Sequence, residues 1–386
     1  MDSNDAQKPA GDVFQAIEPL SKAAAIRELH VPSYSVFDGL HWDSTRGLGR
    51  FSSQLKRHLS LMPWNHVPVP NPPWKSAPGR VLIHEVVEPF WRETLAPDLA
   101  FYPHNVMPVL FLSHRSLRVV VVHDVLFLAA GERSWGNQYR RAKLKRSLAA
   151  ADIVVTVSEH SRAQIRHLLV REIPVLLVPN ALAGGFEAVG PPAPQRRPGV
   201  PRILHFGGHA PTKNTKSLLE AVAMLNRNGI PVHLLLAAMS AQSNRMEEWR
   251  RLAQLDSAAL TILPSMTDEE LRQTYADSDL HCMPSTGEGF GIPVIEAARL
   301  GTPNVLSPLP VFREMVGEDA VYARSFEAND IALAIRQALA SDLSEMVSRA
   351  QVRSGRYLFE SVHSLDAALV LTQVQAMAAS RLKKGL

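Results

Sequence analysis

The chain alternates short apolar runs with helical stretches, stops at a proline-rich segment and then begins the alternation again. Alternating strands and helices are typical of a parallel sheet with helices on both faces. The interrupting segment, residues 190–201, holds five prolines and two glycines in twelve positions, which suits neither a helix nor a strand. The sequence therefore predicts an α/β fold of two doubly wound, Rossmann-like domains joined by one linker. The length of 386 residues is enough for two domains of roughly 150–200 residues each.

We place the boundaries where the pattern changes: an N-terminal extension at 1–29, a first domain at 30–188, a linker at 189–201, a second domain at 202–355 and a C-terminal helix at 356–386 that can pack back on the first domain. The expected strands are 34–39, 81–87, 99–104, 118–124, 152–158, 175–180, 202–208, 232–238, 260–264, 280–285 and 304–308. The expected helices are 48–59, 139–151, 159–170, 215–227, 247–255, 267–276, 293–300, 330–340 and 361–382.

Composition excludes several classes of protein. A single cysteine, Cys282, excludes an internal disulfide framework and a metal site built from several cysteines, and it suits a reducing compartment. The polar, acidic start lacks the pattern of a secretory signal, and we find no apolar run long enough to span a membrane, so we expect a cytoplasmic protein. The net charge is +4, and residues 1–185 carry 21 Lys and Arg against 16 Asp and Glu. The positive excess therefore lies in the first half, which indicates an anionic partner there.

The most informative segment is 287–297, GEGFGIPVIEA, which follows an expected strand. Pro293 stands where the first residue of a helix should be, a position that tolerates a missing N–H. Glycines just before a helix expose backbone N–H groups at its positive end, and this arrangement binds anions. Glu288 in the loop and Glu296 in the helix can face one cleft, where a carboxylate accepts hydrogen bonds from sugar hydroxyls. A tight turn flanked by solvated glutamates is the alternative interpretation.

These two glutamates have seven residues between them, and this spacing resembles that of the retaining glycosyltransferases of family 4, which have the GT-B fold. The resemblance covers about residues 30–360 and is closest to bacterial mannosyl- and rhamnosyltransferases of surface polysaccharide assembly. Seven further segments occur in the family's order: PHNVMP (103–108), VVHDVLF (121–127), DIVVTVSEHSR (152–162), VPNAL (178–182), FGGHAPTKN (206–214), DEELRQTYADSDL (268–280) and FREMVGEDAVYA (312–323).

The resemblance implies a role for each matching residue. Glu296 would bind the ribose hydroxyls of a nucleotide-sugar donor, Glu288 the transferred sugar, and Lys213 the diphosphate. His123 would orient the sugar, although a histidine at a strand end can equally be only hydrogen-bonded within the core. Its neighbour Asp124 is given a structural role. The implied catalytic residues are His123, Glu288 and Lys213, and the implied donor site comprises Gly47, Gly49, Gly208, Lys213, Asn214, Ser265, Met266, Glu288, Phe290, Gly291, Ile292 and Glu296.

One element of the family pattern is missing. The family often carries an arginine in the loop before the lysine, but here Gly208 and Thr212 occupy those places. A cationic contact to the donor is therefore absent or supplied from elsewhere. The first-half loop Thr45–Arg50 resembles the family's glycine loop and is placed to approach the donor phosphates or the acceptor.

Basic and aromatic residues gather in the first half. The helix expected at 139–151 and the proline-rich segment 62–80 lead us to assign an acceptor or anionic-membrane role to Trp64, Trp74, Arg140, Arg141, Lys143, Lys145 and Arg146. A solvated basic helix face is the alternative interpretation. A lipid-linked acceptor would suit a peripheral position on the inner face of the cytoplasmic membrane.

Other signals do not carry a function. Asp277-Ser278-Asp279 has the spacing of a metal-binding motif but precedes a strand, so we expect neither a metal nor another cofactor. The segment 47–52 approximates a dinucleotide-binding motif, yet no acidic residue lies between Asp43 and Glu85 to bind a ribose. Nucleic acid is not expected as a partner.

We therefore expect a retaining glycosyltransferase that moves a hexose, with mannose favoured, from a GDP-, UDP- or dTDP-linked donor to a glycan or a lipid-linked oligosaccharide. Three alternatives stay open: a nucleotide-sugar epimerase, a phosphorylase, and a non-catalytic nucleotide-sugar-binding partner of another transferase. The phosphorylase would need a pyridoxal-phosphate lysine that the sequence does not identify.

Overall fold

The computed structural model describes residues 33–37, 48–70, 82–108, 116–129, 135–182, 184–186, 198–208, 210–238 and 244–362, with 372–374, 376–377 and 380. The chain divides into two compact units, Met1–Val31 and Pro32–Leu386, and every described residue belongs to the second. The predicted extension 1–29, most of the linker and most of the C-terminal helix lie outside the described residues, as do Gly47 and Trp74. The predicted domain boundaries stay a prediction.

The first half of the described chain forms one parallel six-stranded sheet of order β2-β1-β3-β4-β5-β6. Its strands are β1 (Ser33–Val36), β2 (Asn65–His66), β3 (Leu99–Tyr102), β4 (Leu117–Val122), β5 (Ile153–Thr156) and β6 (Val175–Leu177). Its helices are α1 (Leu48–Ser60), the π-helix η1 (Ile83–Val87), α3 (Glu88–Leu95), α4 (Leu126–Ala129), α5 (Trp135–Ala150) and α6 (Glu159–Arg166).

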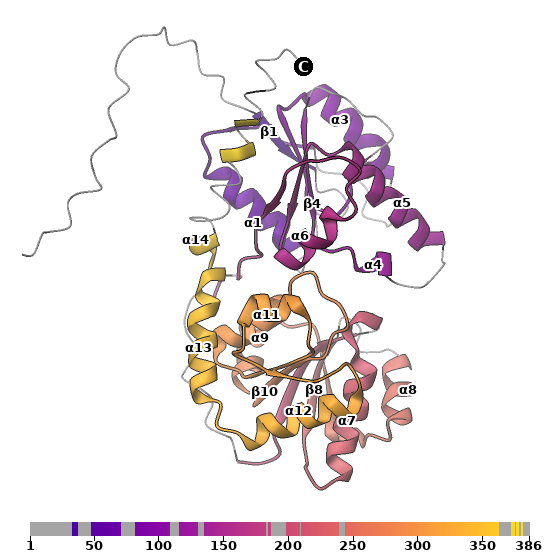
Figure 1. Cartoon of the computed structure of the whole chain (residues 1–386), viewed down its shortest axis with the longest axis vertical. Coiled ribbons are helices and arrows are strands. Elements are labelled where there is room, and N and C mark those ends of the chain that lie inside the picture. The colour runs from indigo at the N-terminus through magenta and orange to yellow at the C-terminus, as the bar shows by residue number, and fades with distance from the viewer. Residues whose placement is uncertain are drawn as a thin grey trace, which may run out of the picture. The chain divides into compact units, whose positions relative to one another are not determined.

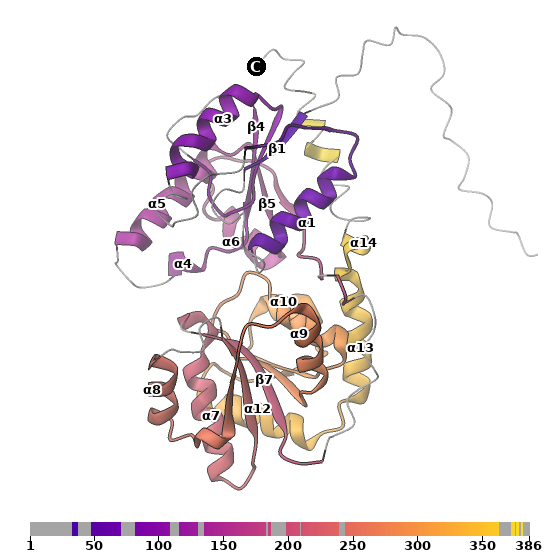
Figure 2. The ribbon, with the colours of Figure 1, turned by 180° about the vertical axis from the view of Figure 1, so that it is seen from behind.

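Both faces of this sheet are covered, which explains why its central strand reads as a continuous apolar run. Every residue of β4 is buried. Val119 and Val121 pack in the cluster that contains Phe51 and Leu55 of α1, whereas Val120 and Val122 pack with Leu144 and Leu148 of α5. Figures 1 and 2 show α1 on one side of the sheet and α3 and α5 on the other. Burial on both faces is characteristic of parallel sheets.

The second half forms another parallel six-stranded sheet, of order β12-β11-β10-β7-β8-β9. Its strands are β7 (Arg202–Gly207), β8 (His233–Ala238), β9 (Leu260–Leu263), β10 (Leu280–Met283), β11 (Asn304–Leu306) and β12 (Val321–Tyr322). The helices are η2 (Pro211–Lys213, 3₁₀), α7 (Thr215–Arg227), α8 (Asn244–Leu252), η3 (Ser257–Ala259, 3₁₀), α9 (Asp268–Ala276), α10 (Ile292–Leu300), α11 (Pro310–Val316), α12 (Ala328–Ala340), α13 (Ser344–Ser354), η4 (Gly355–Tyr357, 3₁₀) and α14 (Phe359–Val362).

The strand order of the second sheet marks where a ligand can bind. The chain begins in the middle at β7, moves outward to β8 and β9, and then returns to place β10 on the other side of β7. In doubly wound sheets ligands bind at such a switch point, outside the carboxyl ends of the strands. The loops that leave these two ends, 208–214 and 284–291, are the two segments that resemble the donor site.

The strand predicted at 81–87 is wrong, because residues Ile83–Val87 form a π-helical turn that continues into α3. A strand would bury alternate residues, but the neighbours Ile83 and His84 are both buried while Val86 is 43% exposed. His84 and Glu88 form a buried pair at 2.8 Å, four residues apart, which closes a helical turn. Helical periodicity therefore fits the pattern of burial better than alternation does.

Candidate functional site

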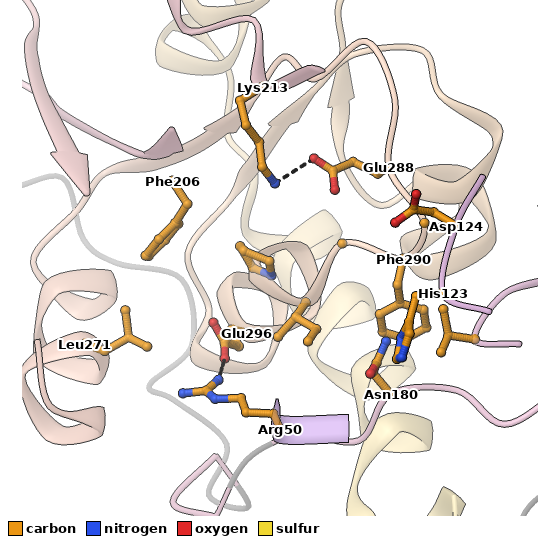
Figure 3. A pocket seen from close by; sticks show the side chains of 15 residues that line it. Arg50, His123, Asp124, Asn180, Phe206, Lys213, Leu271, Glu288, Phe290 and Glu296 are labelled. Carbon is orange, nitrogen blue, oxygen red and sulfur yellow. Dashed lines mark hydrogen bonds and ion pairs between the residues drawn. The ribbon is translucent and has the colours of Figure 1, made fainter. Parts of the chain in front are cut away.

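A cavity of about 350 Å³ opens at this switch point, and residues of both halves line it (Figure 3). Two ion pairs lie in its wall. The first joins Lys213 and Glu288, and the second joins Arg50 and Glu296. The lining residues are Arg50, His123, Asp124, Val157, Asn180, Phe206, Lys213, Leu271, Glu288, Gly289, Phe290, Gly291, Ile292, Pro293 and Glu296. The cavity thus brings part of the predicted site together with residues that are distant in the chain.

The first ion pair joins the two loops of the second sheet. Lys213 ends the 3₁₀ turn η2, and its Nζ donates to Glu288 Oε1 at 2.8 Å. Ser285 Oγ donates to the same oxygen at 2.7 Å. The turn depends on Asn214, whose φ of 54° is left-handed and whose side chain donates to the carbonyls of Pro284 and Phe326. Asn214 therefore acts here by holding the lysine loop against the glutamate loop, and it does not line the cavity.

Close packing shapes the glycine loop. A Cβ atom on Gly289 would lie 2.4 Å from the carbonyl oxygen of His123, so a side chain does not fit there. Ser158 Oγ donates to the Gly289 carbonyl at 2.7 Å, and Ser161 Oγ at 3.2 Å. Gly291 has a φ of 112°, which permits the turn into α10, and Pro293 stands in the first turn as predicted. In this first turn Pro293 has no N–H and the Val294 N–H donates to the Gly291 carbonyl at 2.9 Å, so the turn attracts an anion through the positive end of the helix dipole.

Glu296 is the carboxylate of the second ion pair. It lies one turn into α10 and is only 2% exposed. Arg50 Nη1 donates to its Oε1 at 2.9 Å and Tyr275 Oη to its Oε2 at 2.9 Å. Burial raises the pKa of the Glu296 carboxyl, and the adjacent Arg50 guanidinium opposes this rise. Burial also raises the pKa of Tyr275, which keeps its hydroxyl a donor.

His123 and Asp124 reach the cavity from the end of β4. The His123 ring donates from Nε2 to the Pro103 carbonyl at 2.9 Å and meets the Phe51 ring edge-on at 4.8 Å. Asp124 Oδ1 accepts the Leu126 N–H at 3.1 Å at the start of α4, which is a structural role, and burial raises its pKa. Because β4 ends at Val122, strand alternation does not turn Asp124 away, and Asp124 lines the cavity beside His123.

The predicted catalytic and donor residues divide into three groups. Seven line the cavity: His123, Lys213, Glu288, Phe290, Gly291, Ile292 and Glu296. Four described ones do not line it: Gly208, Asn214, Ser265 and Met266. Gly49 lies in the first turn of α1, and Gly47 is outside the described residues.

The residues assigned to an acceptor or a membrane occupy different environments. Trp64 is 7% exposed and packs edge-on against Tyr34, so it belongs to the core of the first half. Lys143 is buried in an ion pair with Glu85, and burial lowers its pKa to about 8. Arg141 donates to the Leu128 carbonyl at 2.7 Å. The cations that α5 exposes are Arg140, Lys145 and Arg146.

Sequence reasoning missed the partners of Glu296. It placed Arg50 in a loop near the donor but did not connect the two residues, which are 246 positions apart. Tyr275 lies in the last turn of α9, within the segment 268–280 that resembles the family, but no role was assigned to it. In the sequence, Arg50 is recognisable only as a cation beside the first glycine loop. Tyr275 is recognisable only as a polar aromatic residue at an otherwise buried position.

Metal-binding geometry is not seen in the described part of the chain, where no group of three or more His, Cys, Asp or Glu side chains could hold an ion. In the same residues no helix is long and apolar enough to cross a bilayer.

Comparison with known proteins agrees with this geometry. Residues 192–353 match the family model described as glycosyl transferases group 1. The serotype-specific mannosyltransferase WbdA of Escherichia coli is 33% identical over 143 residues, which are 36% of this chain and 17% of WbdA. The O-antigen chain mannosyltransferase B of Escherichia coli is 27% identical over 251 residues, 61% of this chain and 65% of that protein. The matched stretches thus span less than two thirds of either relative.

Solved structures show the fold. Sucrose-phosphate synthase from Thermosynechococcus elongatus superposes with a TM-score of 0.71 at 18% identity, over 90% of this chain and 100% of that one. Together with the two parallel sheets, this likeness confirms the predicted GT-B fold. The chain therefore has the GT-B fold, and its residues 192–353 are similar to the glycosyl transferases group 1 family.

Proposed function

We propose that the protein is a retaining glycosyltransferase that transfers a hexose from a nucleotide-sugar to a glycan or lipid-linked acceptor in polysaccharide biosynthesis. The observation that carries this proposal is the grouping of Lys213, Glu288 and Glu296 with the first turn of α10 in one cavity at the switch point of the second sheet. The names of the two Escherichia coli relatives favour mannose as the transferred sugar.

Each residue of the cavity has a task in this reaction. The Glu296 carboxylate accepts hydrogen bonds from the ribose hydroxyls, and Glu288 accepts those of the sugar. As the bond between the anomeric carbon and the donor oxygen breaks, negative charge grows on the diphosphate. The Lys213 ammonium and the positive end of the α10 dipole stabilise that charge. The acceptor oxygen forms the new bond on the same face, and its proton passes to the leaving phosphate oxygen.

We propose that this transfer needs no metal ion, because Lys213 and the start of α10 already supply positive charge where the diphosphate would lie. Turnover that survives EDTA would support this part of the proposal. Loss of turnover with EDTA and its return with Mg²⁺ or Mn²⁺ would contradict it.

A donor-hydrolysis assay tests the activity. The protein is incubated with GDP-, UDP- and dTDP-linked hexoses, and release of nucleoside diphosphate is followed. A transferase slowly hydrolyses its own donor, whereas a non-catalytic binding partner does not. An epimerase would convert the sugar without a net loss of donor. The missing loop arginine is the observation that keeps the non-catalytic alternative in view.

Two variants and a matched control locate the chemistry. Lys213→Met and Glu288→Gln should each lower turnover by about a hundredfold or more, because each removes a group that contacts the reacting part of the donor. Lys216→Met is the control, since Lys216 is an exposed lysine of α7 paired with Glu220 at 3.8 Å. If both cavity variants keep the activity of the wild type, the site is wrongly assigned.

We also propose that the first half contacts an anionic membrane surface, where the exposed cations of α5 would lie. The neighbouring helical segment exposes apolar side chains four residues apart, Leu82 (47%), Val86 (43%) and Phe90 (65%). Glu85 of that segment bonds Tyr139 of α5 at 3.2 Å, so the two surfaces adjoin. Exposed apolar groups beside Lys and Arg suit an interface with acidic lipids.

Vesicle sedimentation tests this contact. Binding should be stronger to vesicles that contain phosphatidylglycerol than to neutral phosphatidylcholine vesicles. Exchange of Arg140, Lys145 and Arg146 for Gln should abolish the preference. Equal binding to both kinds of vesicle would contradict the proposal.

A further inference from the structure

Arg50 connects the two halves at the inner end of the cavity. It lies in the first turns of α1, beside the first sheet, yet it forms ion pairs with two residues of the second half. Its Nη1 lies 2.9 Å from Glu296 Oε1 in α10, and its Nη2 lies 2.8 Å from Asp268 Oδ1 at the start of α9. Figure 3 shows the guanidinium pointing at Glu296, with the pair of Lys213 and Glu288 on the opposite side of the cavity. Arg50 therefore lies at the Glu296 end of the cavity.

The electrostatics at Glu296 require such a partner. Its side chain is 3% exposed, and an ionised carboxylate is costly to bury without a compensating charge. The groups that face it are Arg50 from α1 and Tyr275 and Asp268 from α9. Tyr275 donates one neutral hydrogen bond, while Asp268 carries charge of the same sign as Glu296. Of these groups, only Arg50 brings positive charge.

We propose that Arg50 is the positioning residue of the donor's ribose site, reaching across from the first half to hold Glu296 ionised and oriented for the ribose hydroxyls. The inference rests on the proposed function, because it assumes that a nucleotide occupies the cavity. It assigns part of the nucleotide affinity to the first half, although the family match begins only at residue 192. Arg50 is a cation of the cavity that comes from α1, far in the chain from the loop of Gly208 and Thr212 where the family's arginine is missing.

The proposal has a pH signature that a merely structural residue would not give. Ribose binding needs the carboxylate form of Glu296, so affinity falls as the pH drops through the pKa of that group. Burial already raises this pKa, and Arg50 opposes the rise. Without Arg50 the pKa rises further, so affinity should be lost at a higher pH than in the wild type. Discrimination between a ribonucleotide and its 2′-deoxy form should also weaken.

The experiment measures binding of UDP and GDP, and of 2′-deoxy-UDP and 2′-deoxy-GDP, by calorimetry from pH 5 to pH 9. Arg50→Met should weaken the better ribonucleotide by roughly tenfold or more at pH 7, and move the acid limb of the affinity profile to higher pH. Arg50→Lys keeps the charge and should restore the position of that limb. Arg57→Met is the matched control on the same helix, where Arg57 is 62% exposed and lies 3.9 Å from Glu360.

The outcomes separate this inference from the function on which it rests. If the wild type binds none of the nucleotides at any pH, both are overturned. If the wild type binds and Arg50→Met keeps the same affinity, profile and preference for ribose, only the role of Arg50 is wrong. A folded Arg50→Met variant that loses affinity equally at every pH would also contradict it, because Glu296 would then titrate independently of Arg50.

Discussion

At the scale of single residues, two buried histidines beneath the cavity stay neutral. His205 Nδ1 donates to the Cys282 carbonyl at 2.9 Å, and its Nε2 accepts from the Thr215 hydroxyl at 3.1 Å. His281 Nδ1 donates to Asn304 Oδ1 at 2.7 Å, and its ring packs beside Phe206 and Tyr275. Burial lowers the pKa of His205 to about 3 and that of His281 to about 4. Both rings thus support the site without carrying charge.

These pKa values predict a loss of stability in mild acid. An unfolded histidine has a pKa near 6.5, so between pH 6.5 and 4 the unfolded chain binds a proton that folded His281 does not bind. The contribution of neutral His281 to the free energy of unfolding is complete above pH 6.5. It is lost as the pH falls toward 4, by on the order of 3 kcal/mol. His281→Gln should reduce this pH dependence in urea unfolding at pH 7 and pH 5. The exposed His66→Gln should not change it. Equal slopes for His281→Gln and the wild type would contradict the assignment.

The acidic and basic residues of the second sheet could be predicted because their spacing is local. Glu288, Glu296 and the turn between them lie within one strand–loop–helix segment, and Lys213 lies in the loop of the neighbouring strand. The partners of Glu296 could not be predicted in this way. Arg50 comes from the other half, and Tyr275 from a helix 21 residues earlier. Such contacts arise from tertiary packing, which the local pattern does not encode.

At the scale of elements, prediction succeeded where a local signal fixes an end. Thr267 caps α9 with the full capping box, because its hydroxyl accepts the Glu270 N–H while Glu270 bonds back. The helix predicted at 215–227 agrees with α7 at both ends. By contrast, η1 and α3 were missed because the valines there suggested a strand. The short helix α11 and strand β12 lack the length needed for a periodic pattern.

The glycine loop gives a prediction for an element. Gly289→Ala should lower turnover at least about tenfold, because the new methyl group would meet the His123 carbonyl at 2.4 Å and displace the loop from β4. Gly355→Ala is the control, since its methyl group would approach nothing closer than 3.8 Å. Turnover by the assay above, with circular dichroism to confirm folding, separates the two. A Gly289→Ala enzyme of normal activity would show that the loop need not lie against β4.

At the scale of the described chain from Ser33 onward, several contacts join the two halves. Glu314 of α11 accepts the N–H groups of Glu159 at 2.7 Å and His160 at 3.1 Å, at the start of α6. The Leu182 N–H donates to the Tyr357 carbonyl at 2.7 Å, and Phe359 stacks on His58 of α1. The sequence predicted two α/β sheets from their repeated pattern. It could not predict how they meet, because these contacts join residues far apart in the chain.

The contact of Glu314 predicts coupling between stability and binding. Glu314→Ala removes an anion and two acceptors from the start of α6 and should lower the free energy of unfolding by about 1 kcal/mol. Because Ser158 and Ser161 of that segment hold Gly289, nucleotide affinity should fall as well. Glu318→Ala is the control, since the Glu318 side chain is 81% exposed and pairs with Arg313 at the surface. Urea unfolding and calorimetry check both effects, and unchanged affinity in Glu314→Ala would show that the halves do not communicate through α6.

The ion pair between Lys213 and Glu288 also bears on how fast a spent donor leaves. Lys213 already has this carboxylate as a partner. A nucleoside diphosphate must compete with Glu288 for the ammonium group, so it gains only the difference between the new contact and the old one. When it dissociates, the same pair re-forms and offsets part of the cost of departure. Under the proposed function, this exchange favours rapid release of the product and limits inhibition by accumulated nucleotide.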